Sequence, residues 1–132
     1  MRAIGPDERQ LLGGLALPFA VMLGIHWLSS LQPAHLPSAL PVPASDKLAH
    51  CVMFAILLSS FRGWRGWHAP AWEWLPGAIA ASIFVAVGDE WHQSFVPGRT
   101  PDVLDLVADV VGIALASAFW AGWSLFRPHR IL

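Results

Sequence analysis

Charged residues are scarce in this chain of 132 residues: 13% are charged, whereas 55% are hydrophobic. The mean hydropathy of +0.53 is too high for an ordinary soluble domain. With a formal net charge of -1, the chain has no broad basic surface of the kind that nucleic acid requires. These shortages favour a single integral membrane domain over residues 1–132 and disfavour nucleic-acid binding.

Cysteine is also scarce, because Cys51 is the only one. A single cysteine excludes an internal disulfide and a CxxC metal motif. We therefore expect Cys51 to be a buried, inert thiol. No residue spacing predicts a metal site, and the sequence assigns neither a cofactor nor an oligomeric state.

Apolar residues are abundant, and they fall into four segments that each predict a helix. The segments are approximately 11–31, 46–61, 74–93 and 102–126. A hydrocarbon core takes about 20 residues to cross, so the second segment is short, and we expect one of its ends to be shielded within protein or to lie at the interface. The predicted fold class is all-α, a polytopic membrane protein with a bundle of four transmembrane helices.

Lys and Arg are divided unevenly between the two sides of the predicted membrane. Six fall on the side of the two termini and the loop between the second and third helices, whereas Lys47 and Arg99 fall on the other side. The positive-inside rule places both termini in the cytoplasm and the opposite helix ends outward. The tryptophans near that loop, including Trp74, are expected to form an aromatic belt at headgroup level.

An acidic stripe begins the last predicted helix. Asp102, Asp105 and Asp109 follow i, i+3, i+7 spacing and therefore share one helix face. Gly112 continues this face and is expected to allow close helix packing. Carboxylates facing lipid are too costly, so the stripe should face a polar cavity inside the bundle. Asp102 also fits a structural role, because an acid after Pro101 complements the dipole at a helix start.

Polar side chains of two other helices are expected to face the same cavity. His50 follows Asp46 by four residues, so the two share a helix face. Glu90 and Gln93 lie three apart near the outward end of the third helix. Asp89 is expected to point elsewhere, as an interfacial polar group, and the histidines outside the second helix are expected to have no chemical role.

Four motifs in one order resemble the VanZ-like family of small bacterial membrane proteins. They are DKLAH at 46–50, E-x-x-Q at 90–93, P-G-R-x-x-D at 97–102 and D-x-x-x-D-x-x-G at 105–112. The resemblance covers roughly residues 46–123. It implies a multi-pass protein of the bacterial cytoplasmic membrane that acts on a lipid or lipid-linked headgroup. It also implies a family link to resistance against the glycopeptide teicoplanin.

The motifs and the expected cavity together favour an intramembrane enzyme that acts on a headgroup at the outer leaflet. Its partner would be a membrane lipid or a lipid-linked cell-envelope precursor. His50 and Glu90 are the acid–base candidates, and Asp105 is expected to orient His50. Arg99 is suited to hold a phosphate through paired hydrogen bonds. The candidate substrate-binding residues are Lys47, Gln93, Arg99, Asp102 and Asp109.

Three alternatives remain open at the level of the sequence. A non-catalytic membrane module that binds a headgroup, a cell-wall precursor or a drug would need the same pocket. The acids and the histidine could instead bind a divalent cation or relay protons. They could also form a buried ion-pair network that only fixes helix register. An isosteric Glu90→Gln change separates the first alternative from an enzyme, because an enzyme loses its function while ligand binding survives.

Overall fold

The computed structural model describes residues 6–31, 45–64 and 69–126, and its described part is entirely helical. In chain order the elements are α1 (Pro6–Ser30), α2 (Ser45–Ser60), the short 3-10 helix η2 (Phe61–Gly63), α3 (Ala71–Gln93) and α4 (Val103–Leu125). The predicted all-α class is confirmed, and each predicted apolar segment corresponds to one long helix.

Three of the helices are long and apolar enough to cross a membrane. These spans are Leu12–Ser30, Ala71–Gln93 and Val103–Leu125, with mean hydropathies of 1.6, 1.4 and 1.9. Large apolar side chains project outward from them, and Phe84 on α3 is 81% exposed. Such a surface is unfavourable in water and favourable against lipid chains. The chain is therefore a membrane-spanning protein.

The remaining long helix, α2, is shorter and more enclosed. Its 16 residues rise about 24 Å, which is less than the hydrocarbon thickness of about 30 Å. Phe54, Leu57 and Leu58 on α2 are each 0% exposed. Most of its helix contacts are with α4. One end of α2 is thus enclosed by protein, as expected, whereas Leu48 near its start is 64% exposed.

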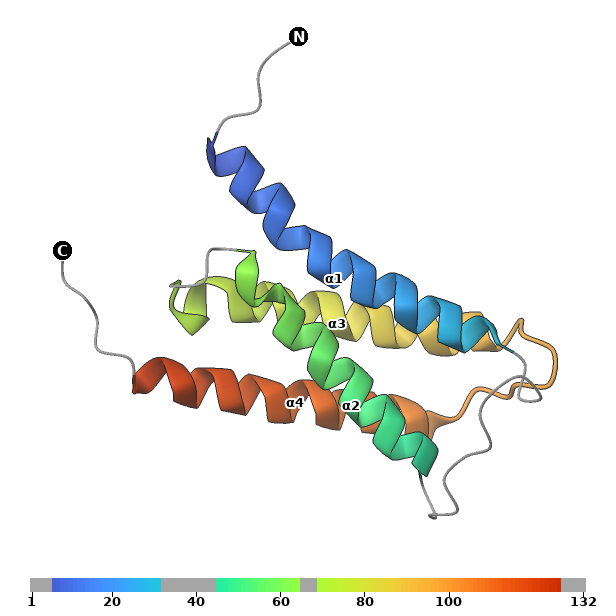
Figure 1. Cartoon of the computed structure of the whole chain (residues 1–132). Coiled ribbons are helices and arrows are strands. Elements are labelled where there is room, and N and C mark those ends of the chain that lie inside the picture. Colours follow the sequence, from blue (N-terminus) through green and yellow to red (C-terminus); the bar gives the residue numbers. More distant parts are fainter. Residues whose placement is uncertain (1–5, 32–44, 65–68, 127–132) are drawn as a thin grey trace, which may run out of the picture.

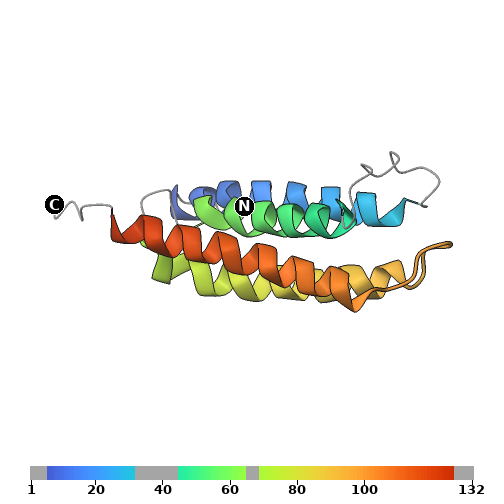
Figure 2. The ribbon, with the colours of Figure 1, turned by 90° about the horizontal axis from the view of Figure 1, so that it is seen from below.

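The four helices alternate in direction (Figures 1 and 2). α1 and α3 run from one end of the bundle to the other, and α2 and α4 run back. The last turns of α1 and α3 therefore lie at the same end as the first turns of α2 and α4. This end, called the site end below, brings together the parts of the sequence that are richest in acids.

Close backbone packing fixes how α2 lies against α4. A Cβ atom added at Gly112 on α4 would collide with the backbone carbonyl group of Cys51 on α2. The predicted close contact at Gly112 is confirmed, because only glycine leaves room for this approach. His50 precedes Cys51, and Asp109 lies three residues before Gly112. The same contact therefore brings the side chains of His50 and Asp109 within reach of each other.

The opposite end of the bundle corrects one prediction. Trp74 is only 1% exposed and packs in the core of the bundle instead of facing lipid headgroups. The guanidinium carbon of Arg62 lies 5.6 Å from the ring centroid of Trp74 and 5.6 Å from that of Trp120. Cation–π contacts with two rings stabilise this buried arginine, and one of these rings is that of the buried Trp74. Trp72, at 63% exposure, remains suited to the interface.

Candidate functional site

Lys47 on α2 forms ion pairs with three aspartates at the site end. Its Nζ lies 2.6 Å from Asp102 Oδ2, 2.5 Å from Asp105 Oδ1 and 3.1 Å from Asp46 Oδ2. Asp102 also caps α4, because its side chain accepts a hydrogen bond from the Leu104 N–H. The predicted structural role of Asp102 is confirmed. The hydrogen bond from the Lys47 ammonium holds the pKa of Asp102 below its usual range.

His50 is paired with Asp109 inside the bundle. His50 Nδ1 lies 2.9 Å from Asp109 Oδ1, and the side chain of Asp109 is 0% exposed. On the other side of the ring, Nε2 lies 3.9 Å from Asp105 Oδ2. Asp105, predicted to orient His50, thus lies next to the ring, but Asp109 makes the closer contact. The close contact of Gly112 with Cys51 fixes the register of α2 against α4, and this register places Asp109 closer to the His50 ring than Asp105.

Glu90 joins this pair from α3. Its Oε2 accepts a hydrogen bond of 3.0 Å from the backbone N–H of Asp102, which ties α3 to the start of α4. One ligand atom each from His50, Glu90 and Asp109 lies within 4.8 Å of the others. We call these three residues the His50–Glu90–Asp109 cluster. It unites one imidazole and two carboxylates from three different helices, and such groups can exchange protons or bind a cation.

Gln93 is also drawn into the interior, together with Asp89. Gln93 Nε2 donates a hydrogen bond of 2.9 Å to Asp89 Oδ2, and the two residues are 2% and 5% exposed. The prediction that Asp89 is an interfacial group is therefore wrong. The sequence could have indicated this contact, because Asp89 and Gln93 are four residues apart and therefore share a helix face.

Arg99 lies against the end of α1. Its Nε donates to the carbonyl oxygen of Leu31 at 3.2 Å, and its Nη2 donates to that of Leu28 at 3.3 Å. Carbonyl groups at a helix end lack partners within the helix, so Arg99 stabilises the end of α1. Within the described residues, the ion pairs of the acidic groups involve Lys47 and His50 rather than Arg99.

A polar contact between α1 and α3 was not predicted. The ring centroids of His26 and His92 lie 4.3 Å apart, and Ser30 Oγ lies 3.0 Å from His92 Nε2. His26 and His92 are far apart in the sequence and lie on different helices, so no local spacing predicts their contact. The histidines outside α2 were expected to have no chemical role, and two of them adjoin the site end.

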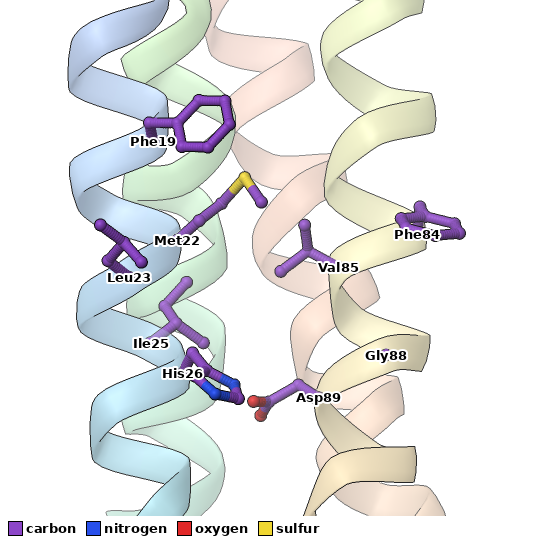
Figure 3. Close-up of a pocket in the computed structure, with 9 residues that line it drawn as sticks. All are labelled: Phe19, Met22, Leu23, Ile25, His26, Phe84, Val85, Gly88 and Asp89. Atoms are coloured by element: carbon purple, nitrogen blue, oxygen red, sulfur yellow. The ribbon is translucent and has the colours of Figure 1, made fainter.

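A groove of about 270 Å³ runs between α1 and α3 (Figure 3). Its lining residues are Phe19, Met22, Leu23, Ile25, His26, Phe84, Val85, Gly88 and Asp89. Most of the lining is apolar, whereas His26 and Asp89 form a polar end, with the Asp89 carboxylate pointing toward the His26 ring. The groove can therefore accept an amphipathic molecule.

The sequence profile of the VanZ/LLP1 family matches residues 10–127. Uncharacterized protein C11E3.10 from Schizosaccharomyces pombe (strain 972 / ATCC 24843) is 35% identical over 78 residues, which make up 59% of this chain and 48% of that protein. The chain thus spans about half the length of this curated relative. No solved structure matches the chain significantly. Because the family profile covers most of the chain, the protein belongs to the VanZ/LLP1 family.

Proposed function

We propose that this membrane protein is an enzyme that modifies the headgroup of a membrane lipid or a lipid-linked cell-envelope precursor. The observation that carries the proposal is the enclosed His50–Glu90–Asp109 cluster within an otherwise apolar bundle. Ionisable groups inside a bilayer are costly, and they mark functional sites more often than structural ones. The cluster offers the proton donors and acceptors that acid–base chemistry on a headgroup requires.

The groove between α1 and α3 supports a substrate with a long apolar chain. Such a chain would contact the apolar lining, and its headgroup would then lie at the polar end beside His26 and Asp89. Asp89 is hydrogen-bonded to Gln93 and directly precedes Glu90 in α3, so the polar end of the groove lies at the same level of α3 as the cluster, although no cluster residue lines the groove. The arrangement favours binding of a lipid over binding of a small polar solute.

We place the protein in the bacterial cytoplasmic membrane with both termini inside and the site end outward. Six Lys and Arg residues on one side against two on the other support this orientation. Both termini lie on one side only if the 16-residue α2, which is not among the three candidate spans, also crosses the membrane, and its alternating direction favours this (Figure 1). The link to glycopeptide resistance rests on the family resemblance alone, and no described contact adds to it.

Mass spectrometry of lipids and lipid-linked glycans tests the proposal in cells that lack the protein. The cells are complemented with wild type, Glu90→Gln or Glu73→Gln at equal protein level. Glu73 is an exposed acid in the first turn of α3, at the opposite end of the bundle, and provides a matched control. We expect wild type and Glu73→Gln, but not Glu90→Gln, to change the same headgroup species.

Identical lipid profiles with wild type and Glu90→Gln would contradict the enzymatic proposal. If both proteins also retained the same headgroup during purification, a non-catalytic binding module would be the better account. Retention is measured by mass spectrometry of the lipids that copurify with each protein.

A further inference from the structure

Two enclosed carboxylate oxygens of the cluster lack a hydrogen-bond partner among the described residues. They are Glu90 Oε1 and Asp109 Oδ2. The Asp109 side chain is 0% exposed, so bulk water does not solvate its free oxygen. A buried anionic oxygen without a partner is unfavourable. Each of these two oxygens is therefore available to a positively charged or hydrogen-donating group.

The spacing of the cluster fits a metal ion in that position. Two ligand atoms that each lie about 2.1 Å from one ion are at most about 4.2 Å apart. The ligand atoms of His50, Glu90 and Asp109 lie within 4.8 Å of one another, so shifts of up to about 1 Å in each side chain bring them to a common centre. Their origin on three helices explains why no local spacing predicted a metal motif.

The histidine is oriented as a metal ligand would be. His50 Nδ1 already lies 2.9 Å from Asp109 Oδ1, which is close to the separation of neighbouring ligands on one ion, about 3 Å. The tautomer with its proton on Nε2 presents the Nδ1 lone pair to the ion. Asp105 then lies on the Nε2 side, 3.9 Å away, where a carboxylate commonly supports a metal-bound histidine.

The local charges also favour a cation. Lys47 is already engaged by three aspartates, and the hydrogen bonds of Arg99 go to carbonyl oxygens of α1. Of Lys47, Arg99 and His50, only His50 lies beside the carboxylates of both Glu90 and Asp109. A divalent ion would supply two positive charges between them.

We propose that His50, Glu90 and Asp109 bind one divalent cation. One imidazole and two carboxylates suit Mn²⁺ or Zn²⁺. Three protein ligands would leave coordination positions for water or for an oxygen of a headgroup. The proposal does not require the enzymatic function, because the ion is expected to bind to the protein without any lipid substrate.

Metal binding is measured on the purified full-length protein in detergent after treatment with a chelator. Equilibrium dialysis with Mn²⁺ is expected to give one ion per chain, and Zn²⁺ is expected to compete for the same site. Pulsed electron paramagnetic resonance of the Mn²⁺-loaded protein is expected to show coupling to a directly bound imidazole nitrogen. His50→Gln should abolish this coupling, whereas His26→Gln should keep it.

Glu90→Gln and Asp109→Asn are each expected to lower the Mn²⁺ affinity by at least about 10-fold. Glu73→Gln should leave it unchanged, because Glu73 lies in the first turn of α3 at the other end of the bundle. Circular dichroism and gel filtration verify that each variant is folded. If one variant does not fold, the nitrogen coupling measured for the wild type and for His26→Gln still tests the proposal.

Three results would overturn the proposal. The first is a wild type that binds neither Mn²⁺ nor Zn²⁺ at millimolar concentration. The second is a wild type that binds Mn²⁺ without nitrogen coupling. The third is Mn²⁺ binding by folded His50→Gln and Glu90→Gln proteins that is as tight as that of the wild type. Loss of lipid modification alone would not bear on this site, because dialysis is carried out without substrate.

Discussion

At the scale of single residues, Lys47 is the main electrostatic link between α2 and the acidic face of α4. Lys47→Met leaves Asp105, whose side chain is only 13% exposed, without its ammonium partner. We expect the melting temperature in detergent to fall by about 5–10 °C. Asp46→Asn removes a partner that is 61% exposed and should have little effect. Equal losses in the two variants would contradict this account.

The pair of Lys47 and Asp102 also predicts a dependence on pH. The lysine lowers the pKa of Asp102 in the folded protein below the unperturbed value of about 3.9. The stabilisation is therefore complete above that value and is lost as the pH falls through the lower pKa of the folded state. Between about pH 5 and pH 3, the melting temperature should decrease more steeply for wild type than for Asp102→Asn. Parallel curves would show that the pair adds no such dependence.

At the scale of helices, Gly112 controls how closely α2 and α4 approach. Gly112→Ala places a methyl group against the Cys51 carbonyl and should lower the melting temperature while weakening the contact of His50 with Asp109. Gly122→Ala on the same helix has no neighbouring atom within 4 Å, so it should be neutral or slightly stabilising. Thermal unfolding of the two variants measures the difference. A destabilisation of similar size in both would argue against a special role for Gly112.

Helix positions followed from the sequence more readily than helix contacts did. The predicted segments 46–61 and 102–126 correspond to Ser45–Ser60 and Val103–Leu125, because charge and proline mark their boundaries. Spacing also indicated that His50 would face the acidic stripe. It did not indicate that Asp109 would make the closest contact, because that depends on the register between two helices.

Contacts that depend on α1 were the least accessible to sequence reasoning. Arg99 was interpreted as a phosphate ligand, and its hydrogen bonds to Leu28 and Leu31 on α1 were not predicted. The contact between His26 and His92 likewise joins two helices without any shared motif. Local periodicity defines the face of a helix, but the partner of that face is decided by packing of the whole bundle.

At the scale of the whole molecule, the alternating helices predict where reporter proteins will be active. Alkaline phosphatase, which is active only outside the cytoplasm, should be active when fused after Ser30 and inactive when fused after Gly63 or Phe126. The first two fusions decide whether α2 crosses the membrane, because a re-entrant α2 would give the same activity at both. Activity after Phe126 would contradict the proposed cytoplasmic C-terminus.

The central claim is that the His50–Glu90–Asp109 cluster carries out chemistry on a lipid headgroup. The most direct measurement is time-resolved mass spectrometry of proteoliposomes made from the purified protein, a total lipid extract of the host and Mn²⁺ or Zn²⁺. With wild type, one headgroup species should be converted over time, and with folded His50→Gln the conversion should stop. Unchanged lipids with wild type, or equal conversion by both proteins, would contradict the claim.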